Sequence, residues 1–280
     1  MAIITLFAGL PKFLTDVHIE TAILPGKLDN MVSSGVLWQA APGRFLLNVP
    51  DVGRYLVENG QCILIDATSK ANEADVLRFL HMMPFAALFY QRNMPVFHAA
   101  AVAMPKRDGC ILLAGDSISG KSSLLATLLQ RGWWLLADDL VVADLNKRGQ
   151  LIVFPTFPEV ILWQDVREKL QIVSTNHRFP QIISYSAQFL TESLPLRAVY
   201  WLSVFNKNEV ELSEIGGKDR FQAMGLLSYN TRIADALLDR FAYFPKVSVF
   251  ARTISVYRLR RPRGRWSMLE SADLVERNKI

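Results

Sequence analysis

The sequence predicts an α/β fold built on a mixed β-sheet and preceded by a smaller α+β region. Three features carry this prediction. An apolar strand, a glycine-rich loop and a helix follow one another over residues 110–132. The next apolar segment, 133–145, holds two acidic residues and continues into a hairpin, which gives the sheet antiparallel neighbours. Upstream, an Asn-Gly pair between two apolar runs predicts a separate hairpin. We therefore expect an N-terminal α+β region over 1–92 and a main domain over 93–280.

The N-terminal region begins with strand signals and ends in a helix. Residues 44–49 predict a strand, and Asn59-Gly60 is the strongest short hairpin signal in the chain. Residues 71–92 predict one helix, with its apolar residues on one face and a kink at Pro84. His18 and His81 stand here without a partner pattern. We therefore interpret both as structural or surface histidines rather than catalytic ones.

The glycine-rich loop fits the pattern G-x-x-x-x-G-K-[ST] and stands between a strand and a helix, as that pattern requires. Glycines let backbone N–H groups converge on an anion, and the helix N-terminus adds positive potential. An ordinary glycine turn before a helix is the alternative, and the strand–loop–helix context favours phosphate. In this hypothesis Lys121 reaches the β- and γ-phosphates and the Ser122 hydroxyl binds Mg²⁺. The predicted nucleotide-binding residues are Gly115, Asp116, Ser117, Ile118, Ser119, Gly120, Lys121, Ser122 and Ser123.

Composition narrows the class of protein. The chain has 280 residues, is 51% hydrophobic and has a formal net charge of +5, a balance that suits a polyanionic nucleotide as well as a nucleic acid. Its two cysteines, Cys62 and Cys110, suggest reduced core thiols. No apolar run reaches the roughly 18 residues of a membrane span, and no basic residue precedes the N-terminal apolar run. We expect a cytoplasmic protein with neither a nucleic acid nor a membrane as partner, and either a monomer or a homo-oligomer.

The acidic pair Asp138–Asp139 lies inside the apolar segment 133–145, which we predict to be one strand. Residues 95–104 predict an earlier strand, and a turn at 146–149 leads into another at 151–155. Adjacent strand residues point to opposite faces, and a buried unpaired carboxylate is costly. A nearby Mg²⁺ or Lys121 would explain at least one of the two. The alternative is that both lie solvated at a strand end.

The remainder of the chain predicts the rest of the main domain. Strands are expected at 160–162, 198–204 and 253–259, and helices at 219–227, 233–244 and 267–277. A run of arginines follows the second of these helices. It is either a solvated loop face or a contact to a nucleotide phosphate or an acidic acceptor, and comprises Arg252, Arg258, Arg260, Arg261, Arg263 and Arg265.

Three blocks of this sequence resemble a known family. HAAAV at 98–102, GDSISGKSS at 115–123 and RGWWLLADDLVV at 131–142 resemble HPr kinase/phosphorylase in order and spacing. They are more similar still to the smaller HPr-kinase-related kinases of peptide-modification clusters, some of which act on lasso-peptide precursors. The resemblance is looser over residues 44–60 and 195–202, and weak at both ends of the chain.

The resemblance implies a fold and a set of roles. The fold would be of the HPr kinase/phosphoenolpyruvate carboxykinase type, a mixed sheet with a P-loop and an Asp pair in the next strand. ATP and Mg²⁺ would be the cofactors, with Lys121 on the phosphates and Ser122 and Asp139 on the metal. Asp138 would be the general base, and His98 would sit beside the pair and tune it. Without the family, the apolar neighbours of His98 favour a core histidine.

Departures from the family pattern concern the acceptor. The segment that supplies a metal-site glutamate in the full-length enzymes reads FPEVILWQD here, where Glu159 or Asp165 can substitute or no residue does. The HPr-acting loop is not recognisable. We therefore expect the acceptor to be a serine on a peptide or small protein, with a lasso-precursor-like peptide favoured over HPr. The arginine run would hold a terminal carboxylate. The alternatives are a kinase for free serine and a nucleotide-binding partner protein without catalysis.

Overall fold

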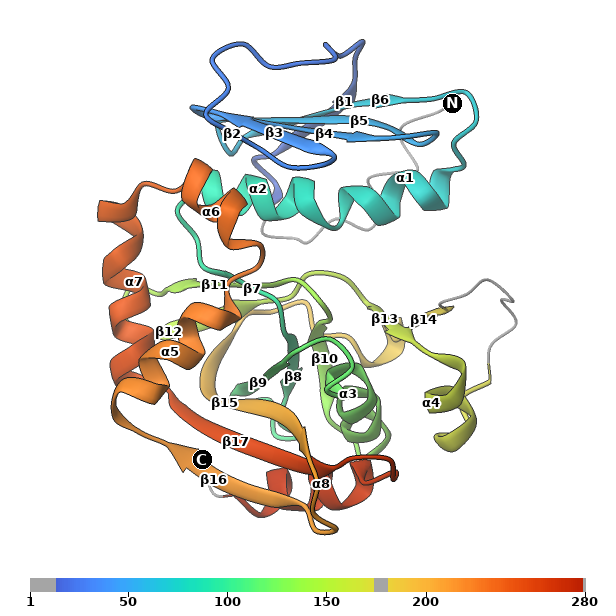
Figure 1. Ribbon diagram of the computed structural model, residues 1–280, viewed down its shortest axis with the longest axis vertical. Coiled ribbons are helices and arrows are strands. Elements are labelled where there is room, and N and C mark those ends of the chain that lie inside the picture. The colour runs from blue at the N-terminus through green and yellow to red at the C-terminus, as the bar shows by residue number, and fades with distance from the viewer. Residues whose placement is uncertain (1–13, 174–180, 279–280) are drawn as a thin grey trace. The chain divides into compact units, whose positions relative to one another are not determined.

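The computed structural model describes residues 14–173 and 181–278 (Figure 1). By contacts the chain separates into two compact units. Unit 1 is Met1–Val96 together with Ser228–Val247, and unit 2 is Phe97–Leu227 together with Ser248–Ile280. The predicted domains, 1–92 and 93–280, differ from these units at residues 93–96 and in the segment Ser228–Val247, and the domain division itself stays a prediction.

Unit 1 contains a six-stranded sheet in the order β1-β6-β5-β4-β3-β2. Only β1 is parallel to its neighbour, and the other pairs are antiparallel. The predicted strand 44–49 and the Asn-Gly hairpin are both confirmed, and Asn59 and Gly60 have φ of +52° and +66° in the turn. The strands are β1 (His18–Thr21), β2 (Ser33–Ser34), β3 (Trp38–Ala41), β4 (Arg44–Val49), β5 (Gly53–Glu58) and β6 (Cys62–Ala67).

The predicted helix 71–92 is wrong as a single element, because it forms two helices, α1 (Glu73–Leu80) and α2 (Met83–Gln91). Pro84 does not kink a helix interior. It lies in the first turn of α2, where its missing N–H removes no helical hydrogen bond. The chain therefore stops and restarts at 81–82 instead of bending. Burial lowers the pKa of His81 to about 4, in keeping with the structural role expected for that histidine.

The predicted helix 233–244 also divides, into α6 (Thr231–Leu237) and α7 (Arg240–Thr253). Leu238 has extended backbone, and the Asp239 carboxylate accepts the N–H of Phe241 at 2.9 Å. An acidic residue just before a helix is a favoured N-cap, so Asp239 ends one helix and starts the next. Helix α6 packs against α2 within unit 1.

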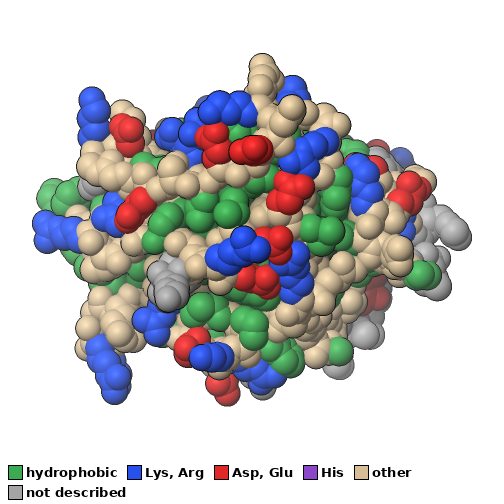
Figure 2. All heavy atoms as spheres, turned by 90° about the horizontal axis from the view of Figure 1, so that it is seen from below, with side chains coloured by type: hydrophobic (Ala, Val, Ile, Leu, Met, Phe, Trp, Pro, Cys, Tyr) green, Lys and Arg blue, Asp and Glu red, His purple; other side chains and the backbone are tan. Residues whose placement is uncertain are grey.

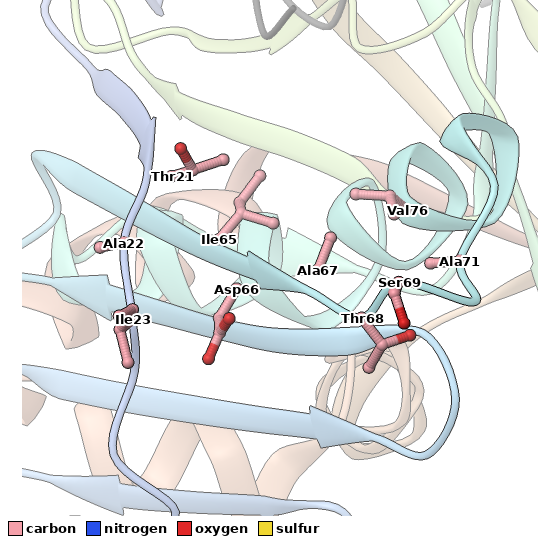
Figure 3. Close-up of a pocket in the computed structure, with 10 residues that line it drawn as sticks. All are labelled: Thr21, Ala22, Ile23, Ile65, Asp66, Ala67, Thr68, Ser69, Ala71 and Val76. Carbon is pink, nitrogen blue, oxygen red and sulfur yellow. The ribbon is translucent and has the colours of Figure 1, made fainter. Parts of the chain in front are cut away.

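A pocket of about 540 Å³ lies within unit 1 (Figure 3). Its walls come from the segment after β1, from the end of β6 and from α1, with Asp66, Thr68 and Val76 among them. None of the site residues predicted from the sequence lines it.

Unit 2 is built on a nine-stranded sheet in the order β10-β8-β9-β15-β12-β11-β7, to which β17 adds beside β15 and β16 beside β17. Strand β15 runs parallel to β9 and β17 but antiparallel to β12, so the predicted mixed sheet is confirmed. The strands are β7 (Val96–Phe97), β8 (Ala100–Ala103), β9 (Cys110–Gly115), β10 (Trp134–Ala137), β11 (Val141–Leu145), β12 (Leu151–Phe154), β15 (Leu194–Phe205), β16 (Glu211–Ile215) and β17 (Ser255–Pro262).

The helix after the glycine-rich loop, α3 (Lys121–Gln130), lies against β8 and β9 and beside α8 (Met268–Arg277) (Figure 1). Leu124 and Leu128 of α3 share a buried core with Ile111 and Leu113 of β9. The predicted strands 160–162, 198–204 and 253–259 and helices 219–227 and 267–277 are confirmed within a few residues. The remaining elements are β13 (Glu159–Leu162), α4 (Gln164–Lys169), β14 (Gln181–Ser184), a short 3-10 turn (Ser186–Gln188) and α5 (Gly217–Leu227). Among the described residues, no helix is long and apolar enough to cross a membrane.

Candidate active site

The glycine loop, residues 115–120, leaves the end of β9 and enters α3. Gly115 has a φ of +134°, and a Cβ there would collide with the carbonyl of Leu202. Gly120 has a φ of +103°, and its Cβ would lie 2.7 Å from Cε of Met268. Glycine suits both positions because the backbone angle is unfavourable for other residues, and at Gly115 the Leu202 carbonyl also leaves no space for a Cβ. The two fixed glycines of the motif are thus explained by local geometry.

Backbone donors at the start of α3 are unoccupied. Gly120 caps the helix without a side-chain hydrogen bond, and within the described chain no acceptor takes the N–H groups of Lys121, Ser122 and Ser123. Among the residues that the structure describes, none bonds to the buried hydroxyl of Ser119. A helix N-terminus with free N–H groups attracts anions. The geometry of the loop therefore fits a phosphate group.

Lys121 is 9% exposed and points back into the loop. Its ammonium donates to the carbonyl of Gly115 at 2.9 Å and to that of Asp116 at 3.3 Å. Burial lowers the pKa of Lys121, and the carboxylates of Asp139, Asp138 and Asp116 act in the opposite direction. The lysine thus lies between the loop and the acidic pair, in electrostatic contact with both.

The predicted strand 133–145 is wrong as a continuous element. It divides into β10 and β11, which pair with β8 and β12 respectively, and the acidic pair lies in the break between them. The N–H of Leu140 donates to the carbonyl of Asp138 at 2.8 Å, and Asp139 has a φ of +67°. A tight turn of this kind frees the two side chains from the strict alternation of a strand. Both carboxylates consequently face other predicted site residues.

Asp138 is held from two sides. The Ser122 hydroxyl lies 3.3 Å from each of its oxygens, and the N–H of Ile161 in β13 donates to it at 3.2 Å. Burial first, and then the negative charge of Asp139, raise the pKa of Asp138 from 3.8 to about 7. The hydrogen bonds from Ile161 and Ser122 and the charge of Lys121 oppose that rise. Groups with such a shifted pKa beside charged partners are candidates for acid–base chemistry.

Asp139 is paired with the histidine that the sequence singled out. Nδ1 of His98 lies 3.0 Å from Oδ1 of Asp139, and the two side chains are 36% and 40% exposed. The predicted strand 95–104 is wrong as one element, since it breaks at His98 and Ala99 between β7 and β8. The His98 N–H bonds instead to the carbonyl of Leu227 at 2.8 Å. The break sets His98 beside the acidic pair rather than within the sheet.

The site offers only a few side chains that could bind a metal ion. Within the two described ranges of the chain, no three His, Cys, Asp and Glu side chains form a group that could hold an ion. Glu159 and Asp165, the two substitutes considered for the missing glutamate, are both exposed. The oxygens of Ser122, Asp138 and Asp139 are the hard ligands that Mg²⁺ prefers, and this ion ordinarily binds through one or two carboxylates plus substrate phosphates. The donor set therefore fits Mg²⁺ bound together with a nucleotide.

The arginine run has no single role. Arg260 pairs with Glu211 and Arg265 with Glu270, whereas Arg261 donates to two carbonyls of the glycine loop. Figure 2 shows one face of the molecule on which Lys and Arg side chains are interspersed with Asp and Glu. The arginines of this run therefore do not act together as one basic patch.

Sequence reasoning missed two residues of the site. The amide of Ile161 carries no sequence signal, because any residue supplies an N–H. Tyr185 follows β14, and burial first, then the charge of Asp138, raise the pKa of its hydroxyl. Pairing of β13 with β14 brings both to Asp138, and that pairing joins segments on either side of residues 163–180.

Comparison with known proteins adds similarity to solved structures. No protein-family model and no curated protein matches this chain. A solved structure described as the Hpr(Ser) kinase/phosphatase from Coxiella burnetii is similar to it with a TM-score of 0.34 and 14% sequence identity. The match covers 65% of this chain and 88% of that one. Membership of that family stays a prediction.

Proposed function

We propose that this protein is an ATP- and Mg²⁺-dependent kinase of the cytoplasm, which transfers the γ-phosphoryl group to a serine hydroxyl. The observation that carries the proposal is the meeting of three features in unit 2. Within the described chain the N–H groups at the start of α3 have no acceptor, the Lys121 ammonium of the same turn donates to the Gly115 carbonyl of the loop, and the Ser122 hydroxyl lies beside Asp138. Phosphoryl transfer requires mainly positioning and charge neutralisation, so this short set of groups is chemically sufficient.

Each group has a place in the proposed reaction. The free N–H groups and Lys121 bind the β- and γ-phosphates, for which Lys121 leaves its loop carbonyls. Ser122 and Asp139 hold Mg²⁺, which when bound neutralises phosphate charge. Asp138 accepts the proton of the acceptor hydroxyl, a role suited to a pKa raised to about 7. His98 fixes the orientation of the Asp139 carboxylate through their 3.0 Å contact.

For the acceptor we propose a serine in a flexible peptide rather than HPr. This choice rests on the sequence, in which the HPr-acting segment is unrecognisable and the resemblance favours peptide-modifying kinases. A nucleotide-binding partner without catalysis is the second candidate. It would need the loop, but it gives no reason for a carboxyl with a raised pKa beside Ser122. A kinase for free serine would use the same site residues.

The test is incubation with labelled ATP, Mg²⁺ and four acceptors: a peptide ending in serine, its C-terminal amide, HPr and free serine. We expect label on the peptide. Lys121→Ala should abolish transfer because it removes the cation from the phosphates, while Lys147→Ala, in the exposed turn after β11, serves as the matched control.

Each alternative outcome has a distinct meaning. Label on HPr alone would overturn the peptide acceptor, and label on free serine alone would favour the small-molecule kinase. Nucleotide binding without transfer to any acceptor would favour the partner protein. Unchanged turnover in Lys121→Ala would remove the role of the glycine loop.

A further inference from the structure

Arg261 links the last strand of unit 2 to the glycine loop. Its Nε donates to the carbonyl of Ser119 at 2.7 Å, and its second terminal nitrogen donates to the carbonyl of Ile118 at 3.2 Å. Arg261 stands near the end of β17, far from the loop in sequence. It also lies beside Gly120, whose added Cβ would come within 3.1 Å of the Arg261 Nε.

The position of Arg261 in its strand distinguishes it from its neighbours. Leu259, two residues earlier on the same face, belongs to the core that contains α3. Arg260 faces the other way and pairs with Glu211 at 2.8 Å. In the described part of the chain, no acidic side chain forms an ion pair with Arg261, so its guanidinium is used on neutral carbonyls.

The carbonyls of Ile118 and Ser119, which Arg261 binds, are positioned in the sequence to accept hydrogen bonds from the first turn of α3. In an α-helix the N–H of residue i bonds to the carbonyl of residue i−4. If α3 began one turn earlier, the carbonyls of Ile118 and Ser119 would therefore accept the N–H groups of Ser122 and Ser123. Those N–H groups are unoccupied within the described chain, and Arg261 fills the acceptors that would otherwise compete for them.

We propose that Arg261 is a positioning residue that keeps the N–H groups at the start of α3 open for the phosphate chain of a nucleoside triphosphate. By binding the carbonyls of Ile118 and Ser119, it holds the loop in its anion-receptive form before the ligand arrives. Preorganisation of this kind raises affinity because the ordering is not required on binding. The inference rests on the proposed function of the glycine loop.

The first measurement is the affinity for ATP with Mg²⁺, by calorimetry, in Arg261→Ala, Arg261→Lys and Arg258→Ala. Because Arg261 makes hydrogen bonds from a charged donor, Arg261→Ala should lower the affinity for ATP by about tenfold to a hundredfold. Lysine keeps the charge but not the two-pronged donor, so Arg261→Lys should fall between wild type and alanine. Arg258 is exposed on the opposite face of the same strand, and its alanine variant should bind like wild type.

The second measurement is amide hydrogen exchange of residues 122 and 123 without nucleotide, which does not depend on activity. We expect fast exchange in the wild type and slower exchange in Arg261→Ala and Arg261→Lys, because the released carbonyls then accept these N–H groups. A merely structural role predicts the reverse, since loss of a packing contact would loosen the loop and speed exchange.

Wild-type affinity for Arg261→Ala, an equal loss in Arg258→Ala, full rescue by lysine, or faster exchange in the Arg261 variants would each overturn the inference. Failure of the wild-type protein itself to bind ATP would instead count against the proposed function, so the two failures are distinguishable.

Discussion

Asp139 has a backbone conformation that few non-glycine residues adopt, with a φ of +67°. Aspartate tolerates this region better than most residues, and the turn it makes lets two adjacent carboxylates serve different partners. Asp138 faces Ser122, while Asp139 faces His98. The division of labour proposed for the pair thus follows from one backbone angle.

Exchange of either carboxylate for an amide separates their roles. Asp138→Asn keeps the shape but removes the proton acceptor, so nucleotide should still bind while phosphoryl transfer falls by roughly 10²–10⁴, the usual contribution of a general base. Asp139→Asn should instead weaken the binding of Mg²⁺, so that a higher Mg²⁺ concentration is needed for transfer. Single-turnover rates and nucleotide affinity in both variants decide the matter. A nearly silent Asp138→Asn beside a severe Asp139→Asn would reverse the two assignments.

The raised pKa of Asp138 predicts a pH dependence of stability. Its carboxyl is held protonated in the folded protein up to about pH 7 but ionises near 3.8 when unfolded, so its contribution to stability is lost as pH rises through that window. Asp138→Asn removes the cost of ionising this buried carboxyl. The difference in the free energy of unfolding between the variant and the wild type should therefore shift in favour of the variant from pH 5 to pH 8, as measured by urea unfolding with nucleotide and metal removed. Equal differences at both pH values would contradict the shift.

At the scale of the element, the glycine loop depends on its two fixed glycines. Gly120→Ala would impose an unfavourable φ of +103° and place a Cβ 3.1 Å from Nε of Arg261, which would displace the loop from Arg261. We expect a clear loss of nucleotide affinity and a lower unfolding temperature. Gly149→Ala is the matched control, since its φ is +71° but its Cβ would meet nothing within 4 Å. It should cost about 1 kcal/mol or a little more in stability and leave binding unchanged.

Elements decided by local sequence were predictable, and breaks decided by distant partners were not. The strand β9, its loop and α3 follow from apolar spacing and glycine positions. Nothing local shows that 95–104 stops at His98, because the N–H of His98 is satisfied by the carbonyl of Leu227. The break at Asp138 likewise depends on β10 and β11 pairing with different strands. The residue types of the site were therefore predictable, whereas its turns were not.

At the scale of the whole molecule, contacts between distant segments decide what belongs together. The sequence singled out the arginine run, but only the pairing of β17 with β15 brings Arg261 to the loop. Residues 228–247 gave no sign that they belong with the N-terminal region, yet they are part of unit 1. Which distant segments pack together can be read only from a tertiary structure, because the periodicity of a segment does not show which other segment it contacts.

The membership of residues 228–247 in unit 1 predicts how a fragment of residues 93–280 behaves. Within unit 1, the carbonyl of Tyr229 accepts the hydroxyl of Tyr90, and Arg232 donates to the carbonyl of Ser34 at 2.6 Å. Ile233 of α6 is fully buried. Removing 1–92 deletes these partners and exposes the apolar side of α6.

We expect this fragment to self-associate or precipitate where the full chain does not, as measured by size exclusion with light scattering. Ile233→Asp in the fragment is the companion variant, and it should restore solubility because it places a charge on the newly exposed surface. The same substitution in the full chain should instead destabilise unit 1, since it buries an unpaired carboxylate. A monodisperse, unmodified fragment would mean that residues 228–247 fold without the N-terminal region, and the predicted boundary at 92–93 would then describe the domains better than the contacts do.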